Sequence, residues 1–272
     1  MEKLSSAQIK QRLLQVLVWF RDRCEEKGYR YFITGGTLLG AVRHGGFIPW
    51  DDDIDVLMPA SDYEKFIHDD FSGAPYKLRS YDLDKQSTTL ITKLYDPNTV
   101  LEAERHMKFP LGVHIDIFAL YPQGATLKDA QALQKDARVP RKFMNWLVAD
   151  KFYIPKNKLN LLPKLFGSCI AKLYGLKRAQ KKLGALKTKY TLEQSNYVGH
   201  INGSFRECAE KWQYDNPSEV MFEGERFACC ADPDKFLTGF YGDYMMLPPE
   251  NERVSHGFGA YIKDDVGDNG LL

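Results

Sequence analysis

The first part of the chain alternates between helix-like and strand-like hydrophobic patterns. Residues 5–27 place apolar side chains at helical spacing, with serines before the first turn and a glycine just past the last. Residues 29–34 (YRYFIT) are aromatic and β-branched, as is typical of a strand, and they run directly into a glycine pair. The pattern then predicts a short helix over residues 37–42 and a second strand over residues 54–58.

Shorter patterns fill the middle of the chain. Ser61 is a candidate N-cap for a helix that runs to about residue 69. Several short runs beyond it favour strands, and the last of them, VHIDIFAL, is mostly apolar with a single acid in its middle. These strand predictions cover residues 76–80, 88–95, 99–104 and 113–120.

The second half of the chain is less regular. Residues 127–149 have a helical pattern that Pro140 is predicted to break or kink. Residues 198–272 are rich in glycine, proline and aromatic residues, and no single period describes them. We therefore predict an α/β (α+β) fold in two parts, a catalytic core of residues 1–123 and a helical and irregular part of residues 124–272 that completes the site.

Composition places the protein among ordinary globular proteins. Hydrophobic residues make up 44% and charged residues 27%, so the chain has enough apolar mass for a core. No stretch approaches the ~20 apolar residues that span a bilayer, and the first residues lack a signal-like apolar segment, so we expect a cytoplasmic protein. The five cysteines are scattered, which predicts buried thiols rather than disulfides or a metal site at the adjacent Cys229 and Cys230.

The net charge of +1 conceals an asymmetry. Residues 151–190 contain eleven Lys or Arg residues and no acid, whereas the rest of the chain has 26 basic residues against all 36 acids. One interpretation is a patch that rests on anionic lipid at the inner face of the membrane, or that holds an anionic or lipid-linked glycan. The alternative is a helical lobe that packs its apolar face on the core and leaves its lysines in water. The segment lacks the interleaved aromatics of single-strand binders, so we do not expect nucleic acid as a partner.

The first chemical motif is Gly35-Gly36-Thr37, between a predicted strand and a predicted helix. Paired glycines let the backbone approach a phosphate closely, and the free N–H groups at a helix start can bind the anion. An ordinary tight turn would use the same residues, so this motif alone leaves both interpretations open.

The second motif is a run of four acids within five residues, DDDID. In a strand, residues two apart point to the same face, so Asp53 and Asp55 would project together while Ile54 and Val56 are buried behind them. Two carboxylates on one strand face suit a hard divalent cation such as Mg²⁺. A solvated acidic loop is the alternative, but apolar residues on both sides of the run argue against it.

The third motif is the lone Asp116 inside the apolar run HIDIF. Burying a single carboxylate without a partner is costly, and a hydrogen-bonded structural role would also account for it. A glycine pair after one strand, two acids on the next and one acid on a later strand form an ordered set. A shared pair of Mg²⁺ ions would give all three acids a reason to converge.

The segment GGTLLGAVRHGGFIPWDDDIDVLMP resembles the signature of the LicD family of phosphotransferases, with fukutin-related proteins as distant relatives. HIDIFAL and YGDYMMLPPENERVSH extend the resemblance toward the C-terminal end. The resemblance implies a nucleotidyltransferase (polymerase-β-like) core with a mixed sheet.

The resemblance also assigns roles by position. It makes Asp51 and Asp52 supporting loop residues, and it lets Lys93 neutralise a phosphate, although a lysine that only extends to solvent is equally consistent. For His256, site contact and a structural hydrogen bond are both open. The implied site comprises Asp53, Asp55 and Asp116 as metal-binding and catalytic acids, and Gly35, Gly36, Thr37, Arg43, His44 and Lys93 as phosphate- or nucleotide-binding residues.

The implied activity is Mg²⁺- or Mn²⁺-dependent transfer of phosphocholine, or a related phospho-group, from CDP-choline or another CDP-linked donor. The acceptor would be a cell-surface glycan or its lipid-linked precursor, and Asp116 would orient or deprotonate its hydroxyl while CMP leaves. One alternative is a nucleotidyltransferase that adds a nucleoside monophosphate to a small molecule or RNA and releases pyrophosphate. Another is a non-catalytic glycan-binding protein on the same scaffold.

Overall fold

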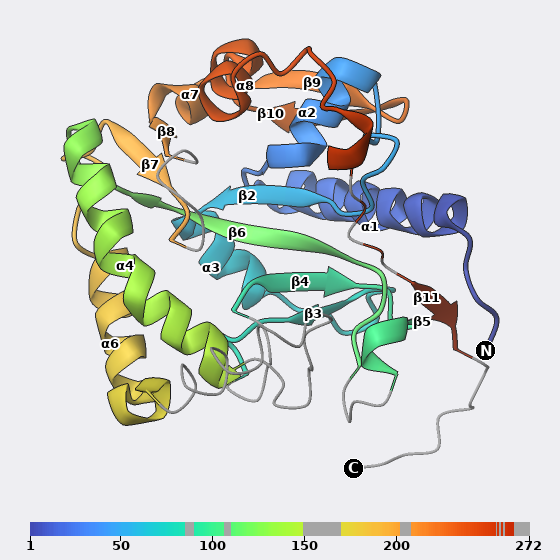
Figure 1. The fold of residues 1–272 in the computed structure, drawn as a ribbon, viewed down its shortest axis with the longest axis horizontal. Coiled ribbons are helices and arrows are strands. Elements are labelled where there is room, and N and C mark those ends of the chain that lie inside the picture. Colours follow the sequence, from blue (N-terminus) through green and yellow to red (C-terminus); the bar gives the residue numbers. More distant parts are fainter. Residues whose placement is uncertain are drawn as a thin grey trace.

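The computed structural model describes residues 1–84, 90–105, 110–148, 170–201, 208–253, 255, 257 and 259–263. A mixed sheet runs through the molecule, with helices on its faces and at one end (Figure 1). The predicted α/β class is thereby confirmed. The elements of the first half are α1 (Ser6–Lys27), β1 (Phe32–Ile33), α2 (Gly35–His44), β2 (Asp55–Pro59), α3 (Ala60–Ile67), β3 (Lys77–Arg79), β4 (Thr92–Tyr95), β5 (Thr99–Leu101), a 3₁₀ turn (Glu102–Glu104) and β6 (His114–Pro122).

The main sheet has the order β1-β2-β6-β4-β3. Strands β2 and β6 are parallel, and the other pairs of this path are antiparallel. The far end of β6 pairs with β7 (Tyr197–Gly199), which in turn pairs with β8 (Ala209–Glu210). Strand β6 therefore joins the central sheet to the second half of the chain. The division near residue 123 stays a prediction.

Helices α1 and α3 cover one face of the sheet. Phe20 of α1 and Phe66 of α3 meet with ring centroids 5.1 Å apart, and both are fully buried. The strand residues on this face, such as Val56 and Ile117, are buried as well. Because side chains alternate along a strand, the acids next to these apolar residues point to the opposite face.

Helix α1 has the predicted ends. The Ser5 side chain accepts from the Gln8 N–H and the Gln8 side chain accepts from the Ser5 N–H, a reciprocal cap. Gly28 closes the helix in the left-handed region at φ 69°.

Other boundaries differ from the prediction. The N-cap of α3 is Pro59 rather than Ser61, because the fixed φ of proline ends β2 and starts the helix directly. Helix α4 (Leu127–Val148) continues through Pro140, so of the predicted break or kink the break is wrong. Packing against α6 (Leu176–Lys187) stabilises this helix.

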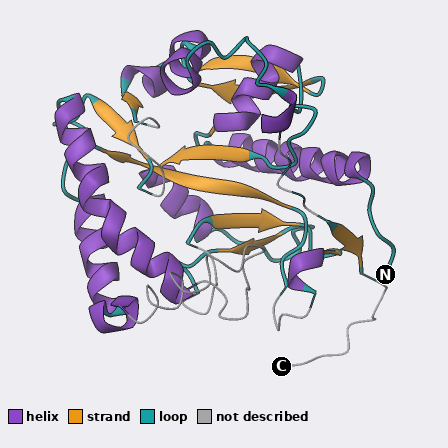
Figure 2. Cartoon of the chain, in the orientation of Figure 1, coloured by secondary structure: helices purple, strands orange, loops and turns teal. Residues whose placement is uncertain are grey.

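A second layer lies above β2 in Figure 1 and is built from α2 and C-terminal elements. Helix α8 (Pro233–Tyr241) packs on α2, and so does β9 (Ser218–Phe222), which forms a hairpin with β10 (Glu225–Cys229). A short helix α7 (Trp212–Asp215) precedes the hairpin. Figure 2 shows that this part contains both helices and strands, although no single hydrophobic period describes its sequence.

The two ends of the described chain meet at strand β11 (Ala260–Ile262). This strand pairs with β5, and the Leu4 N–H donates to the carbonyl of Ala260 at 2.9 Å. Within the described residues, no helix is long and apolar enough to cross a bilayer.

Two sequence interpretations concern parts of this second half. Residues 151–169 of the basic segment lie outside the described residues. In the part that is described, α6 buries Ala179, Leu183 and Leu186 and exposes lysines. The predicted buried thiols are confirmed for Cys24, Cys229 and Cys230.

Candidate active site

The sheet register places two of the predicted acids side by side. Asp55 on β2 is the direct partner of Asp116 on β6, and Asp116 is the direct partner of Lys93 on β4. Arg79 on β3 continues the row as the partner of Lys93. Register partners point to the same face, so two acids and two bases form a line across four strands on the face that α1 and α3 leave open.

Lys93 is the centre of a compact polar group. Its Nζ lies 2.5 Å from Asp116 Oδ1 and 2.9 Å from His114 Nε2. The side chains of Lys93, Asp116 and His114 are 14%, 19% and 8% exposed, so this ion pair is mostly shielded from water. Lys93 therefore contacts a site carboxylate and does not extend into solvent.

His114 was not predicted as a site residue, although its position two residues before Asp116 on a strand is the signal that could have identified it. Burial lowers the pKa of His114 to about 4, and the nearby Lys93 charge acts in the same direction. The ring is thus neutral at pH 7. Its Nδ1 lies 2.9 Å from the Gly112 carbonyl, so Nδ1 carries the proton and Nε2 accepts from Lys93.

Asp55 stands among like charges. Burial raises the pKa of its carboxyl well above the ordinary value, and repulsion from Asp116, Asp53 and Asp51 adds to the effect, while Lys93 opposes it. Asp53 lies just before β2 and is partly buried. The sheet register brings Asp55 and Asp116 together, and the place of Asp53 beside them stays a prediction.

The glycine pair forms the first turn of α2 instead of preceding the helix. Gly35 adopts a positive φ of 56°, which a side chain would strain, and a Cβ there would lie 3.3 Å from Asp55 Oδ2. A Cβ on Gly36 would lie 2.8 Å from Asp51 Oδ2. Only glycine permits both carboxylates to approach the start of the helix this closely.

Thr37 connects α2 to β2. Its hydroxyl accepts from the Asp55 N–H at 2.9 Å, and the Thr34 N–H donates to the Asp55 carbonyl at 3.1 Å. The Thr34 side chain makes no capping hydrogen bond to the start of α2. A helix start is a place where backbone N–H groups can bind an anion.

The acidic loop before β2 is held by the C-terminal part of the chain. Ser255 Oγ donates to Asp52 Oδ2 at 2.9 Å, and the Arg253 guanidinium lies 5.1 Å from the ring centroid of Trp50. Asp52 is thus a supporting residue of the loop, as predicted.

Two predicted residues are not brought to this point. Arg43 and His44 lie at the other end of α2, about 12 Å along the helix axis from Gly35. Arg43 Nη1 donates to the Tyr244 carbonyl at 2.7 Å, and its Nε contacts the His44 ring at 3.0 Å. Their role in phosphate binding stays a prediction. His256, for which site contact and a structural hydrogen bond were both open, lies outside the described residues.

A pocket of about 150 Å³ opens beside the glycine turn. Asp55 and the first residues of α2 form one wall, and aromatic rings from β6 and α8 form another. The aromatic wall comprises Phe118, His200, Phe236, Phe240 and Tyr241.

The side chains of the site offer oxygen ligands for the expected metal ion. As the structure stands, no three His, Cys, Asp or Glu side chains of the described residues surround a point where a metal could sit. The adjacent pair Asp55 and Asp116 supplies carboxylate oxygens, which Mg²⁺ and Mn²⁺ prefer, and a cation would relieve their repulsion. This pair fits a hard divalent cation, and the third acid, Asp53, stays a predicted ligand.

Comparison with known proteins defines the class. Residues 28–153, which contain the glycine turn and all three acids, match the family described as LicD/FKTN/FKRP, nucleotidyltransferase domain. The chain belongs to the LicD family and is an enzyme, a transferase of phosphorus-containing groups.

Two relatives show how far the similarity extends. The chain is 30% identical over 267 residues to the lipopolysaccharide cholinephosphotransferase LicD of Haemophilus influenzae, covering 94% of this chain and 97% of that protein. It is 59% identical over 32 residues to the human ribitol 5-phosphate transferase FKRP, which is 12% of this chain and 6% of that protein.

Proposed function

We propose that the protein transfers phosphocholine from CDP-choline to a sugar hydroxyl of a cell-surface glycan or its lipid-linked precursor. The observation that carries the proposal is the pocket in which a helix start, a site carboxylate and an aromatic wall meet. The full-length relative from Haemophilus influenzae is named for the same transfer to lipopolysaccharide.

The phosphate end of the donor is assigned to the start of α2. The N–H groups at the start of α2, from Gly35 and Gly36, and the positive end of the helix dipole would attract phosphate oxygens. Lys93 adds a positive charge one strand beyond Asp116. These groups offset the repulsion that a phosphate would meet from the carboxylates.

The choline end is assigned to the aromatic wall. A quaternary ammonium makes no hydrogen bonds and is bound by the faces of aromatic rings. Phe240 and Tyr241 meet edge to face at 4.4 Å and line the same pocket as Gly35, so both ends of phosphocholine have a partner there. A CDP-linked polyol donor would gain less from this wall.

The reaction is a displacement at phosphorus. The acceptor hydroxyl oxygen forms a bond to the phosphorus of phosphocholine, the bond to the bridging oxygen breaks, and CMP leaves. Asp116 orients the acceptor hydroxyl or takes its proton, while Lys93 fixes the carboxylate through their ion pair. Mg²⁺ or Mn²⁺ on Asp53, Asp55 and Asp116 would supply charge stabilisation for the attacking and leaving oxygens.

The nucleotidyltransferase-like architecture is part of this proposal. A glycine-opened helix before an acid-bearing strand, with a further acid on the neighbouring strand, is what that fold requires of the core. A cytoplasmic or membrane-peripheral location, with residues 151–190 as the contact, is likewise proposed on the basis of the basic segment.

Calorimetric titration with CDP-choline, CTP and CDP-ribitol, each with and without Mg²⁺, tests the donor. We expect Mg²⁺-dependent binding of CDP-choline that Asp53→Ala abolishes and that the exposed control Asp22→Ala retains. Preference for CTP would favour the nucleotidyltransferase alternative, and preference for CDP-ribitol a polyol-phosphate transferase. Absence of binding by all three would refute a CDP-linked donor.

A further inference from the structure

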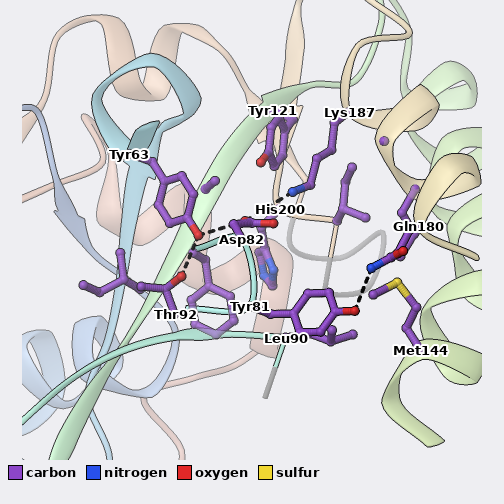
Figure 3. Close-up of a pocket in the computed structure, with 16 residues that line it drawn as sticks. Tyr63, Tyr81, Asp82, Leu90, Thr92, Tyr121, Met144, Gln180, Lys187 and His200 are labelled. Atoms are coloured by element: carbon purple, nitrogen blue, oxygen red, sulfur yellow. Dashed lines mark hydrogen bonds and ion pairs between the residues drawn. The ribbon is translucent and has the colours of Figure 1, made fainter. Parts of the chain in front are cut away.

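A second, larger pocket of about 310 Å³ lies next to the candidate active site (Figure 3). Strand β4 pairs with β6 only as far as Ile117, whereas β6 continues to Pro122, paired with β2 as far as Leu120 and with β7 at its last two residues. The space left where β4 ends is closed by α3, by the turn after β3 and by α4 and α6. The pocket is thus a product of the unequal strand lengths.

One pair of rings separates the two pockets. Phe118 and His200 line both of them, and their ring centroids are 4.6 Å apart. A ligand in the larger pocket would therefore lie directly beside a donor held at Asp55 and the glycine turn.

The walls of the larger pocket combine aromatic rings with polar groups. Tyr63, Tyr81 and Tyr121 are nearly fully buried, and Figure 3 shows them around the side chain of Asp82. Asp82 Oδ2 accepts from the Tyr63 hydroxyl at 3.1 Å and lies 3.4 Å from Lys187 Nζ. The Lys187 ammonium also lies 5.3 Å from the ring centroid of Tyr121.

Helix α6 contributes Gln180 to the pocket wall as well as Lys187. Gln180 Nε2 donates to the Tyr81 hydroxyl at 2.6 Å, which leaves the amide oxygen of Gln180 and its second N–H for a ligand. Donors and acceptors therefore occur on both sides of the pocket, between ring faces.

The charges indicate the class of ligand. Asp82 and Lys187 face the same space as a close ion pair, so their charges offset each other. A cation would be repelled by Lys187 and an anion by Asp82. A neutral saccharide suits both, because its hydroxyls can pair with the carboxylate, the ammonium and the amide while its C–H faces lie on tyrosine rings.

We infer that this pocket binds a neutral sugar ring of the acceptor, and that the Phe118–His200 pair positions its hydroxyl toward the phosphorus of the donor. The inference rests on the proposed function, because it assigns the second substrate of that reaction. It places specificity for the acceptor on Asp82, Lys187 and Gln180, which contact none of the site carboxylates.

The test uses methyl glycosides of the common hexoses and N-acetylhexosamines as probes, with saturation-transfer NMR on the full chain. We expect Asp82→Asn and Lys187→Met each to weaken binding of the preferred glycoside about tenfold, the loss typical of one charge-assisted hydrogen bond. Lys182→Met is the matched control, because Lys182 is an exposed lysine of the same helix and does not line the pocket.

The two substitutions separate the ligand classes. A cation pocket would hold tetramethylammonium through Asp82 and lose it in Asp82→Asn, and an anion pocket would hold phosphate through Lys187 and lose it in Lys187→Met. Either loss, or glycoside binding that is insensitive to both changes, would overturn the inference. Titration of the same preparations with CDP-choline tests the proposed function separately. If the wild-type chain does not bind CDP-choline but does bind a glycoside, the proposed donor is wrong while the sugar pocket stands.

Discussion

The Lys93→Met substitution examines the central polar group of the site. Methionine keeps much of the aliphatic length of lysine but removes the ammonium that contacts Asp116 and His114. The Asp116 carboxylate is then left beside Asp55 in a mostly buried position, with a like charge as its neighbour.

The expected cost follows from the burial. Removing one partner of a buried ion pair typically costs about 3–5 kcal/mol, and the partial exposure of Asp116, 19%, places this case near the lower end. For a chain of this size, a loss of about 3 kcal/mol corresponds to a fall in Tm of roughly 6–12 °C. Thermal unfolding followed by circular dichroism in EDTA measures it directly.

Lys65→Met provides the matched control. Lys65 is 64% exposed and lies 3.7 Å from Asp62, so its removal should cost less than about 1 kcal/mol. Added Mg²⁺ should recover part of the stability of Lys93→Met, since a cation at Asp55 and Asp116 would replace the missing charge. A fall in Tm no larger than that of Lys65→Met would refute the reasoning about the buried pair, and absence of recovery by Mg²⁺ would refute the metal assignment.

Three further predictions concern the same face of the sheet. Gly35→Ala should abolish turnover and lower the free energy of unfolding by about 1 kcal/mol or more, because Gly35 has a positive φ and a Cβ would approach Asp55. An activity assay and denaturant unfolding measure the two effects, and unchanged values would contradict the assigned turn. Asp55→Asn should abolish Mg²⁺-dependent turnover yet raise Tm in EDTA, because it removes a carboxylate whose pKa is raised by burial and by Asp116; a lower Tm would contradict the repulsion. The pKa of His114 is about 4 in the folded state and 6.5 in the unfolded state, so between these pH values only the unfolded state binds the proton. The free energy of unfolding should therefore fall by about 3 kcal/mol as the pH falls from 6.5 to 4. Urea titration in EDTA measures this loss, which should be absent in His114→Gln.

The local features of the site could be predicted from the sequence. Each of the three motifs can be interpreted from a few neighbouring residues. They are the glycines at the end of a strand, the acids two residues apart and the single acid in an apolar run. The sheet register then brings Asp55 and Asp116 together, and Lys93 joins them because a lysine among apolar strand residues needs a partner. The LicD family resemblance, confirmed over nearly the whole chain, depended on these same short segments.

The aromatic wall and the larger pocket could not be predicted, because they depend on contacts between distant segments. Phe118 meets His200 across the end of β6, and Gln180 meets Tyr81 across 99 residues. The hydrophobic pattern of α8 shows only that one of its faces packs on α2. Pro140 shows the opposite case, since a local rule predicted a break that the contact between α4 and α6 overrides.

The contact between Ser255 and the acidic loop before β2 has a consequence for the order of folding. Asp52 is fixed by Ser255 across 203 residues, and β5 pairs with β11 across about 160 residues. Contacts of such high sequence separation form late, because the entropy of closing the intervening chain must be offset first. During synthesis, the loop that carries the acids therefore lacks its hydrogen bond to Ser255 until that residue has left the ribosome. The chain acquires its transferase geometry only when nearly all of the described sequence has been made.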